Sequence, residues 1–131
     1  MIFDTKGVTA GYWAATGLLG AALLGGGIMD LVGPPELVET LESLGYPLYL
    51  MPLLGVAKLL AGVAILAPNF QRLKEWAYAG VAVDFLGASY SHAVNQQFDD
   101  MATPLLLTVL MFMSWYLRPA HRELPDVATA A

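Results

Sequence analysis

Residues 47–67 read PLYLMPLLGVAKLLAGVAILA, an apolar run in which Lys58 is the only charged side chain. The next apolar run, residues 76–94, reads WAYAGVAVDFLGASYSHAV and carries one acid, Asp84. A helix of about 20 residues crosses the ~30 Å hydrocarbon core of a bilayer, so both runs have near-spanning length. Each charge costs roughly 2.5 to 3.5 kcal/mol at the centre of a membrane helix. We therefore expect the chain to pair these two charges or to use them.

Two further apolar runs, residues 12–32 and residues 102–118, bring the number of candidate spanning helices to four. Of the 131 residues 57% are apolar and only 13% are charged, and a soluble domain of this size cannot cover such a composition with a polar surface. We predict one integral membrane domain over residues 1–131, an all-α four-helix transmembrane bundle whose helices run up-down-up-down. A mobile tail is expected over residues 120–131.

The first outer loop is predicted to contain a short amphipathic helix over residues 35–44. Pro34 and Pro35 suit its first turn, because proline is tolerated where the backbone N–H has no helical partner. Glu36 complements the positive end of the helix dipole, and Gly45 suits the C-terminal cap. Leucine and valine side chains share one face while the glutamates face water. We expect this helix on the outer surface, as a lid over the bundle or as a simple connector.

In a bundle of four spanning helices, the two termini and the second loop lie on the same side of the membrane. Five of the six basic residues occur in these three segments. They lie in the N-terminal tail, the second loop and the C-terminal tail, whereas the first and third loops hold only acids. By the positive-inside rule that side is the cytoplasm, so both termini are expected there. These residues are Lys6, Arg72, Lys74, Arg118 and Arg122.

The composition argues against several classes of function. The net charge of −5 argues against nucleic acid as a partner. The chain contains no cysteine, which excludes disulfide exchange by the chain itself, thiolate metal sites and iron–sulfur ligation. No metal site is expected, because a single histidine and separated carboxylates in the apolar runs do not give a known ligand spacing.

Lys58 and Asp84 are predicted to meet inside the bundle. Lys58 shares a helix face with Gly55 and Gly62, and Asp84 shares a face of the next helix with Gly80. Such small-residue faces let membrane helices approach closely. At 1.5 Å per residue, Lys58 lies about 16 Å from the outer end of its helix and Asp84 lies about 12 Å from the inner end of the next. In a ~30 Å core the two charges therefore lie at nearly the same depth.

A second polar layer lies nearer the outside, and it comprises Asp30, Tyr90, Ser91 and His92. Together with Lys58 and Asp84, these residues predict a polar pocket under the loop helix. The leading hypothesis is a non-catalytic or accessory membrane protein that binds the polar head of a lipophilic small molecule with these six residues.

Three other hypotheses remain open. The protein can be a membrane-embedded isomerase or oxidoreductase, in which Asp84 or His92 moves a proton and Lys58 stabilises an anionic intermediate. It can be a small proton-coupled transporter, although that function needs a carboxylate free to exchange its proton, and Asp84 is expected to have Lys58 as its partner. The ion pair can also serve only to fix the register of two helices.

The first apolar run carries a stripe of small residues, Gly17, Ala21 and Gly25, at four-residue spacing. This pattern is typical of close contacts between membrane helices. It fits packing inside the bundle and a homo-oligomer equally well.

Six segments carry a family resemblance: GIMDL at 27–31, PPE at 34–36, LGYP at 44–47, LGVAKLL at 54–60, RLKEWAYAG at 72–80 and SH at 91–92. In this order they resemble the DoxX-like family of small four-helix membrane proteins of bacteria. The resemblance covers roughly residues 12–118, nearly the whole chain.

The resemblance implies a place in the bacterial inner membrane and a quinone-linked or scaffold role. Relatives in the wider group include a subunit of a thiosulfate:quinone oxidoreductase and membrane partners of redox or detoxifying enzymes. A quinone is therefore a candidate ligand, no other cofactor is expected, and a membrane redox enzyme is a candidate partner. Some members carry a basic residue near the position where this chain has Asp30.

Overall fold

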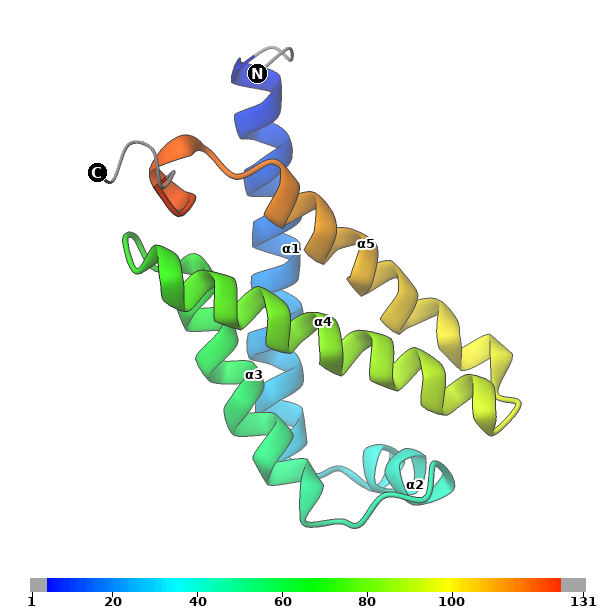
Figure 1. Ribbon diagram of the computed structural model, residues 1–131. Coiled ribbons are helices and arrows are strands. Elements are labelled where there is room, and N and C mark those ends of the chain that lie inside the picture. Colours follow the sequence, from blue (N-terminus) through cyan, green and yellow to red (C-terminus); the bar gives the residue numbers. More distant parts are fainter. Residues whose placement is uncertain (1–4, 126–131) are drawn as a thin grey trace.

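The computed structural model describes residues 5–125, which form α-helices that alternate in direction along the chain (Figure 1). The helices are α1 (Thr5–Val32), α2 (Pro35–Ser43), α3 (Leu50–Leu66), α4 (Gln71–Val94) and α5 (Ala102–Tyr116), with short 3₁₀ turns η1 (Phe98–Met101) and η2 (Ala120–Arg122). The long helices pack in a ring, α1 on α3, α3 on α4, α4 on α5 and α5 on α1. No strand occurs in the described range. The predicted all-α class is confirmed.

Only one of these described helices is long and apolar enough to cross a membrane by length and composition alone. This helix is α1, over Lys6–Val32. α3 is apolar but has 17 residues, and α5 has 15, both short of the roughly 20 that a ~30 Å core requires. α4 has 24 residues, but several charges lower its hydropathy. Of the four predicted membrane spans, α1 meets this criterion, and α3, α4 and α5 do not.

α1 and α3 pack backbone to backbone through two glycines. A Cβ atom added at Gly27 would lie 2.8 Å from the Gly55 oxygen, and one added at Gly55 would lie 2.8 Å from the Gly27 oxygen. About two turns further along α3, Gly62 lies against the Leu24 side chain of α1, where an added Cβ atom would lie 2.9 Å from Leu24 Cδ2. The prediction that Gly55 and Gly62 face the helix of Asp84 is therefore wrong, because α1 occupies that face of α3.

The other predicted small-residue faces make no such contact. A Cβ atom added at Gly17, Gly25 or Gly80 would meet no other atom within 4 Å. The stripe of Gly17 and Gly25 thus lies away from the face by which α1 packs on α3.

Hydroxyl groups link three helices inside the bundle. The Ser114 Oγ atom lies 2.6 Å from Thr16 Oγ1 and 2.7 Å from the Tyr78 hydroxyl oxygen, which joins α5 to α1 and α4. All three side chains are buried. Buried hydroxyls need partners, so this network favours one register of the three helices. The apolar core beside it contains Leu19, Leu23, Ile65, Val81, Phe85 and Met111.

Two buried cations satisfy the last carbonyl groups of α3. The Lys74 ammonium group donates to the Ala64 oxygen at 2.7 Å and to the Ala67 oxygen. The Arg122 guanidinium group donates to the two carbonyl oxygens between them, at 3.0 and 3.3 Å. Positive charge at a helix C-terminus also interacts favourably with the helix dipole. The last turn of α3 is therefore capped by one cation from the first turn of α4 and by one from the C-terminal segment.

The contacts of Arg122 change the expectation for the C-terminal tail. A mobile tail was expected over residues 120–131, but η2 places Arg122 at 5% exposure against the end of α3. The guanidinium group also lies 4.7 Å from the Trp13 ring centroid, on α1. The tail is thus docked at its start, and the part of that prediction over residues 126–131 lies outside the described residues.

Arg122→Met is expected to lower the free energy of unfolding by about 1.5 kcal/mol, because it removes the donors of two carbonyl groups at the end of α3. Thermal unfolding of the protein in detergent, followed by circular dichroism, measures this change. Arg72→Met is the matched control, since Arg72 is exposed, and it is expected to leave the unfolding temperature unchanged. Equal unfolding temperatures for the two variants would contradict the capping role of Arg122.

The amphipathic helix predicted in the first loop is present as α2, and its end is built as expected. Gly45 has a φ of +84°, a conformation that favours glycine. The Tyr46 N–H donates to the Leu41 oxygen at 3.2 Å, which closes the turn. The Tyr46 hydroxyl then hydrogen-bonds to the Ser91 hydroxyl on α4. The loop is thereby attached to the C-terminal end of α4.

Candidate functional site

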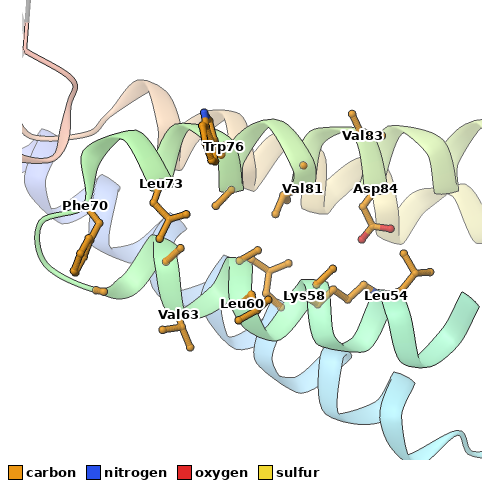
Figure 2. Close-up of a pocket in the computed structure, with 17 residues that line it drawn as sticks. Leu54, Lys58, Leu60, Val63, Phe70, Leu73, Trp76, Val81, Val83 and Asp84 are labelled. Atoms are coloured by element: carbon orange, nitrogen blue, oxygen red, sulfur yellow. The ribbon is translucent and has the colours of Figure 1, made fainter.

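A cavity of about 690 Å³ lies between α3 and α4 (Figure 2). We call it the α3–α4 cavity. Its lining consists mainly of leucine, valine and alanine side chains from the two helices, with Leu23 of α1 behind them. Lys58 and Asp84 are the charged residues of the lining. The cavity is thus an apolar space with a polar end formed by these two residues.

The opposite end of the cavity is formed by aromatic side chains near the turn between α3 and α4. Phe70 lies at this end, and Trp76, further along α4, is also part of the lining (Figure 2). The turn is tight, and both Asn69 and Phe70 have a positive φ, of 66° and 56°. A non-glycine residue in this conformation is uncommon. The turn brings α3 and α4 together as antiparallel neighbours, as the short connection predicts.

Lys58 forms its ion pair with Asp30 of α1. The Lys58 Nζ atom lies 2.9 Å from Asp30 Oδ2, and the Asp30 side chain is 10% exposed. The predicted Lys58–Asp84 contact is therefore wrong about the partner, although the predicted Lys–Asp pair inside the bundle exists. The reason is the packing of α3 on α1, because a Cβ atom at Gly55 would lie 3.1 Å from the Asp30 Cβ atom. The glycine contact brings Asp30 to the helix face of Lys58.

Asp84 faces the same space without an ion pair. Its carboxylate points into the cavity on the side of Lys58 (Figure 2). Within residues 5–125, the ion pairs are Lys58 with Asp30 and Arg118 with Glu75, so Asp84 takes part in neither. The charges of Lys58 and Asp30 still act on Asp84 through space, with opposite signs. Asp84 thus keeps the free carboxylate that the transporter hypothesis requires.

A comparison with known protein families matches residues 14–114 to the DoxX-like family. The chain belongs to the DoxX-like family. The matched range runs from α1 into α5 and contains every residue of the α3–α4 cavity. The family identified from sequence segments is confirmed. No curated protein and no solved structure matches the chain.

The outer polar residues of this DoxX-like protein lie apart from the cavity. Ser91 binds Tyr46, and it also donates to the Gly87 oxygen at 2.8 Å. The His92 Nδ1 atom lies 3.0 Å from the Gln97 side-chain oxygen. Tyr90 is 71% exposed. Tyr90, Ser91 and His92 do not occur in the lining of the cavity, so the structure does not bring the two predicted polar layers together.

The outer layer instead attaches the first loop to the bundle. The Gln97 side chain that contacts His92 also donates to the Ser43 hydroxyl at 3.2 Å, at the end of α2. With the contact between Tyr46 and Ser91, this gives two polar links between the loop and α4. The two candidate catalytic residues, Asp84 and His92, are therefore found in different surroundings.

Sequence reasoning missed the aromatic end of the cavity. Trp76 and Phe70 carry no signal of a ligand site in the sequence, because a tryptophan at a helix end is typical of the membrane interface. Their position depends on the left-handed turn at Asn69 and Phe70, which is formed without glycine at either position. The described residues contain no group of three or more side chains able to hold a metal ion.

Proposed function

We propose that this DoxX-like protein lies in the bacterial inner membrane and binds a lipophilic small molecule in the α3–α4 cavity. The single observation that carries this proposal is the cavity of about 690 Å³, apolar along its length and charged at one end. Ligand sites are typically mostly apolar, with volumes of roughly 300 to 1,000 Å³ and a few placed polar groups. Lys58 and Asp84 are those groups here.

The distribution of apolar side chains supports insertion of all four long helices. Large apolar residues outside the cavity lining are exposed on each of them, including Leu18 at 60%, Leu53 at 63%, Leu86 at 47% and Leu106 at 63% exposure. Hydroxyl groups, in contrast, meet inside the bundle. An apolar exterior around a partly polar interior is stable in lipid and would be an aggregation hazard in water. In this proposal α3 and α5 are short spans, accommodated by local thinning of the bilayer.

The orientation follows from the basic residues. Lys74, Arg118 and Arg122 gather at the end of the bundle where α3 ends, α4 begins and α5 ends. By the positive-inside rule, this end and both termini face the cytoplasm, and α2 lies on the outer side.

The protein acts, in this proposal, as a binding or accessory subunit that presents its ligand to a membrane redox enzyme. Of the two proton-transfer candidates in the enzyme hypothesis, the cavity lining supplies Asp84 but not His92. The Lys58 ammonium group, which would stabilise an anionic intermediate in that hypothesis, already forms an ion pair with Asp30. The geometry therefore favours binding over chemistry.

Gly80→Phe is expected to abolish binding of a neutral lipophilic probe, pyrenebutanol, to the protein in phosphatidylcholine nanodiscs. Gly80 lines the cavity, and a Cβ atom there meets no other atom, so the phenyl ring enters the cavity without displacing the backbone. Energy transfer from tryptophan to pyrene measures binding, because Trp76 lines the same cavity. We expect the affinity to fall at least about tenfold.

Gly87→Phe is the matched control. Gly87 lies on the same helix, also has open space at its Cβ position, and is not part of the lining. It should bind pyrenebutanol as the unchanged protein does. Because the probe also dissolves in the lipid, this control shows how much of the energy transfer does not depend on the cavity. Equal binding by both phenylalanine variants would show that the cavity is not the ligand site.

A further inference from the structure

The charges at the polar end of the α3–α4 cavity do not balance. Lys58 and Asp30 form an ion pair at 2.9 Å, so their charges cancel within the pair. Asp84 lines the same end and takes part in neither ion pair of the described residues. With all three groups ionised, this end of the cavity carries one net negative charge.

The unpaired charge lies in apolar surroundings. The neighbours of Asp84 in the cavity are side chains such as Leu54 and Val81, which offer no hydrogen bond (Figure 2). A charge removed from water costs several kcal/mol unless a partner compensates it. Lys58 compensates this charge only in part, because its ammonium group is paired with Asp30, whose carboxylate opposes the field of Lys58 at Asp84. The open side of Asp84 is the cavity itself.

The rest of the cavity suits an apolar molecule. From Asp84 the lining continues along alanine and leucine side chains, past Trp76, to the ring of Phe70 at the other end (Figure 2). These side chains give a ligand an apolar path along α3 and α4. A ligand that fills the cavity therefore places an apolar body along the helices and its polar group near Asp84.

We propose that the α3–α4 cavity binds a lipophilic monocation, a hydrophobic tertiary amine or quaternary ammonium compound whose charge lies against Asp84. This inference rests on the proposed function and narrows its ligand to one charge class. An anionic amphiphile would meet a net negative charge. A neutral molecule would leave Asp84 without a partner. A cation alone satisfies both the charge and the apolar lining.

Three pyrene probes with the same alkyl chain test this inference: the trimethylammonium, the alcohol and the carboxylate derivatives. Their dissociation constants are measured by energy transfer from tryptophan, with the full protein in phosphatidylcholine nanodiscs. We expect the trimethylammonium probe to bind about tenfold more tightly than the alcohol, and the carboxylate to bind most weakly.

Asp84→Asn removes the charge of Asp84 and keeps a side chain of nearly the same shape. This variant is expected to lose the preference for the cation, so that the trimethylammonium and alcohol probes bind with similar affinity, and Asp84→Glu is expected to keep the preference. Equal binding of the three probes to the unchanged protein, or the same preference in Asp84→Asn, would overturn the inference. In both cases the alcohol still binds, so the proposed function stands. Failure of every probe to bind would instead remove the proposed function.

Phosphatidylethanolamine provides the last comparison, because its zwitterionic headgroup also carries an ammonium group on an apolar body. The site is inferred to take a small molecule, so adding this lipid to the nanodiscs should leave binding of the trimethylammonium probe unchanged. A large loss of probe binding in these nanodiscs would show that the site holds a lipid headgroup, which would overturn the assignment to a small molecule.

Discussion

Lys58→Met is expected to lower the free energy of unfolding by about 3 kcal/mol, because it leaves the Asp30 carboxylate buried without its partner. The Asp30 side chain is 10% exposed, and its Oδ2 atom lies 2.9 Å from the Lys58 Nζ atom. Removal of one member of a buried pair typically costs about 3 to 5 kcal/mol, and we expect the lower end because the Lys58 side chain keeps 23% exposure. Thermal unfolding in detergent and equilibrium unfolding in a denaturing detergent measure the change.

The double variant Asp30→Asn with Lys58→Met tests whether the stability lost in Lys58→Met comes from the unpaired Asp30 carboxylate. Because it removes both charges, it should recover most of the stability lost in Lys58→Met. Asp84→Asn should be neutral or slightly stabilising, since Asp84 has no ion pair to lose among the described residues. The opposite order, with Asp84→Asn destabilising and Asp30→Asn neutral, would show that Asp84 is the partner of Lys58.

The depth of the charges could be predicted from the sequence, but their partner could not. Counting residues from the helix ends places Lys58 and Asp84 at one height, because the rise per residue is constant. The partner depends instead on which face of each helix meets which neighbour. Both glycine faces looked equivalent in the sequence, yet α3 uses Gly55 to approach α1. Asp30, assigned to an outer layer, thereby becomes the partner of Lys58.

The ends of the helices also show that local sequence signals predict only local contacts. The apolar run and the cap at Gly45 predict α2 because those signals are local. The capping of α3 by Arg122 joins positions 56 and 57 residues apart in the sequence, and no local pattern indicates it. The sequence therefore predicts that Arg122 belongs to a mobile, positively charged tail. In the structure the Arg122 side chain is buried and caps the end of α3.

Gly27→Ala is expected to destabilise the protein by about 2 kcal/mol, although alanine is the better helix former. The added Cβ atom would lie 2.8 Å from the Gly55 oxygen and 2.9 Å from the Leu59 Cγ atom. The first of these is backbone, so relief requires α1 and α3 to move apart. That movement also lengthens the ion pair between Asp30 and Lys58, which is carried by the same two helices. Thermal unfolding in detergent measures the loss.

Gly25→Ala is the control, because it makes the same change two residues earlier on the same helix. A Cβ atom there meets no other atom within 4 Å. Without a clash, only the helix propensity changes, and alanine should raise the stability by up to about 1 kcal/mol. The two variants are thus expected to shift the unfolding temperature in opposite directions. A loss in Gly25→Ala with no change in Gly27→Ala would mean that α1 packs by its Gly17 and Gly25 stripe, and that the contact placing Asp30 beside Lys58 is not formed.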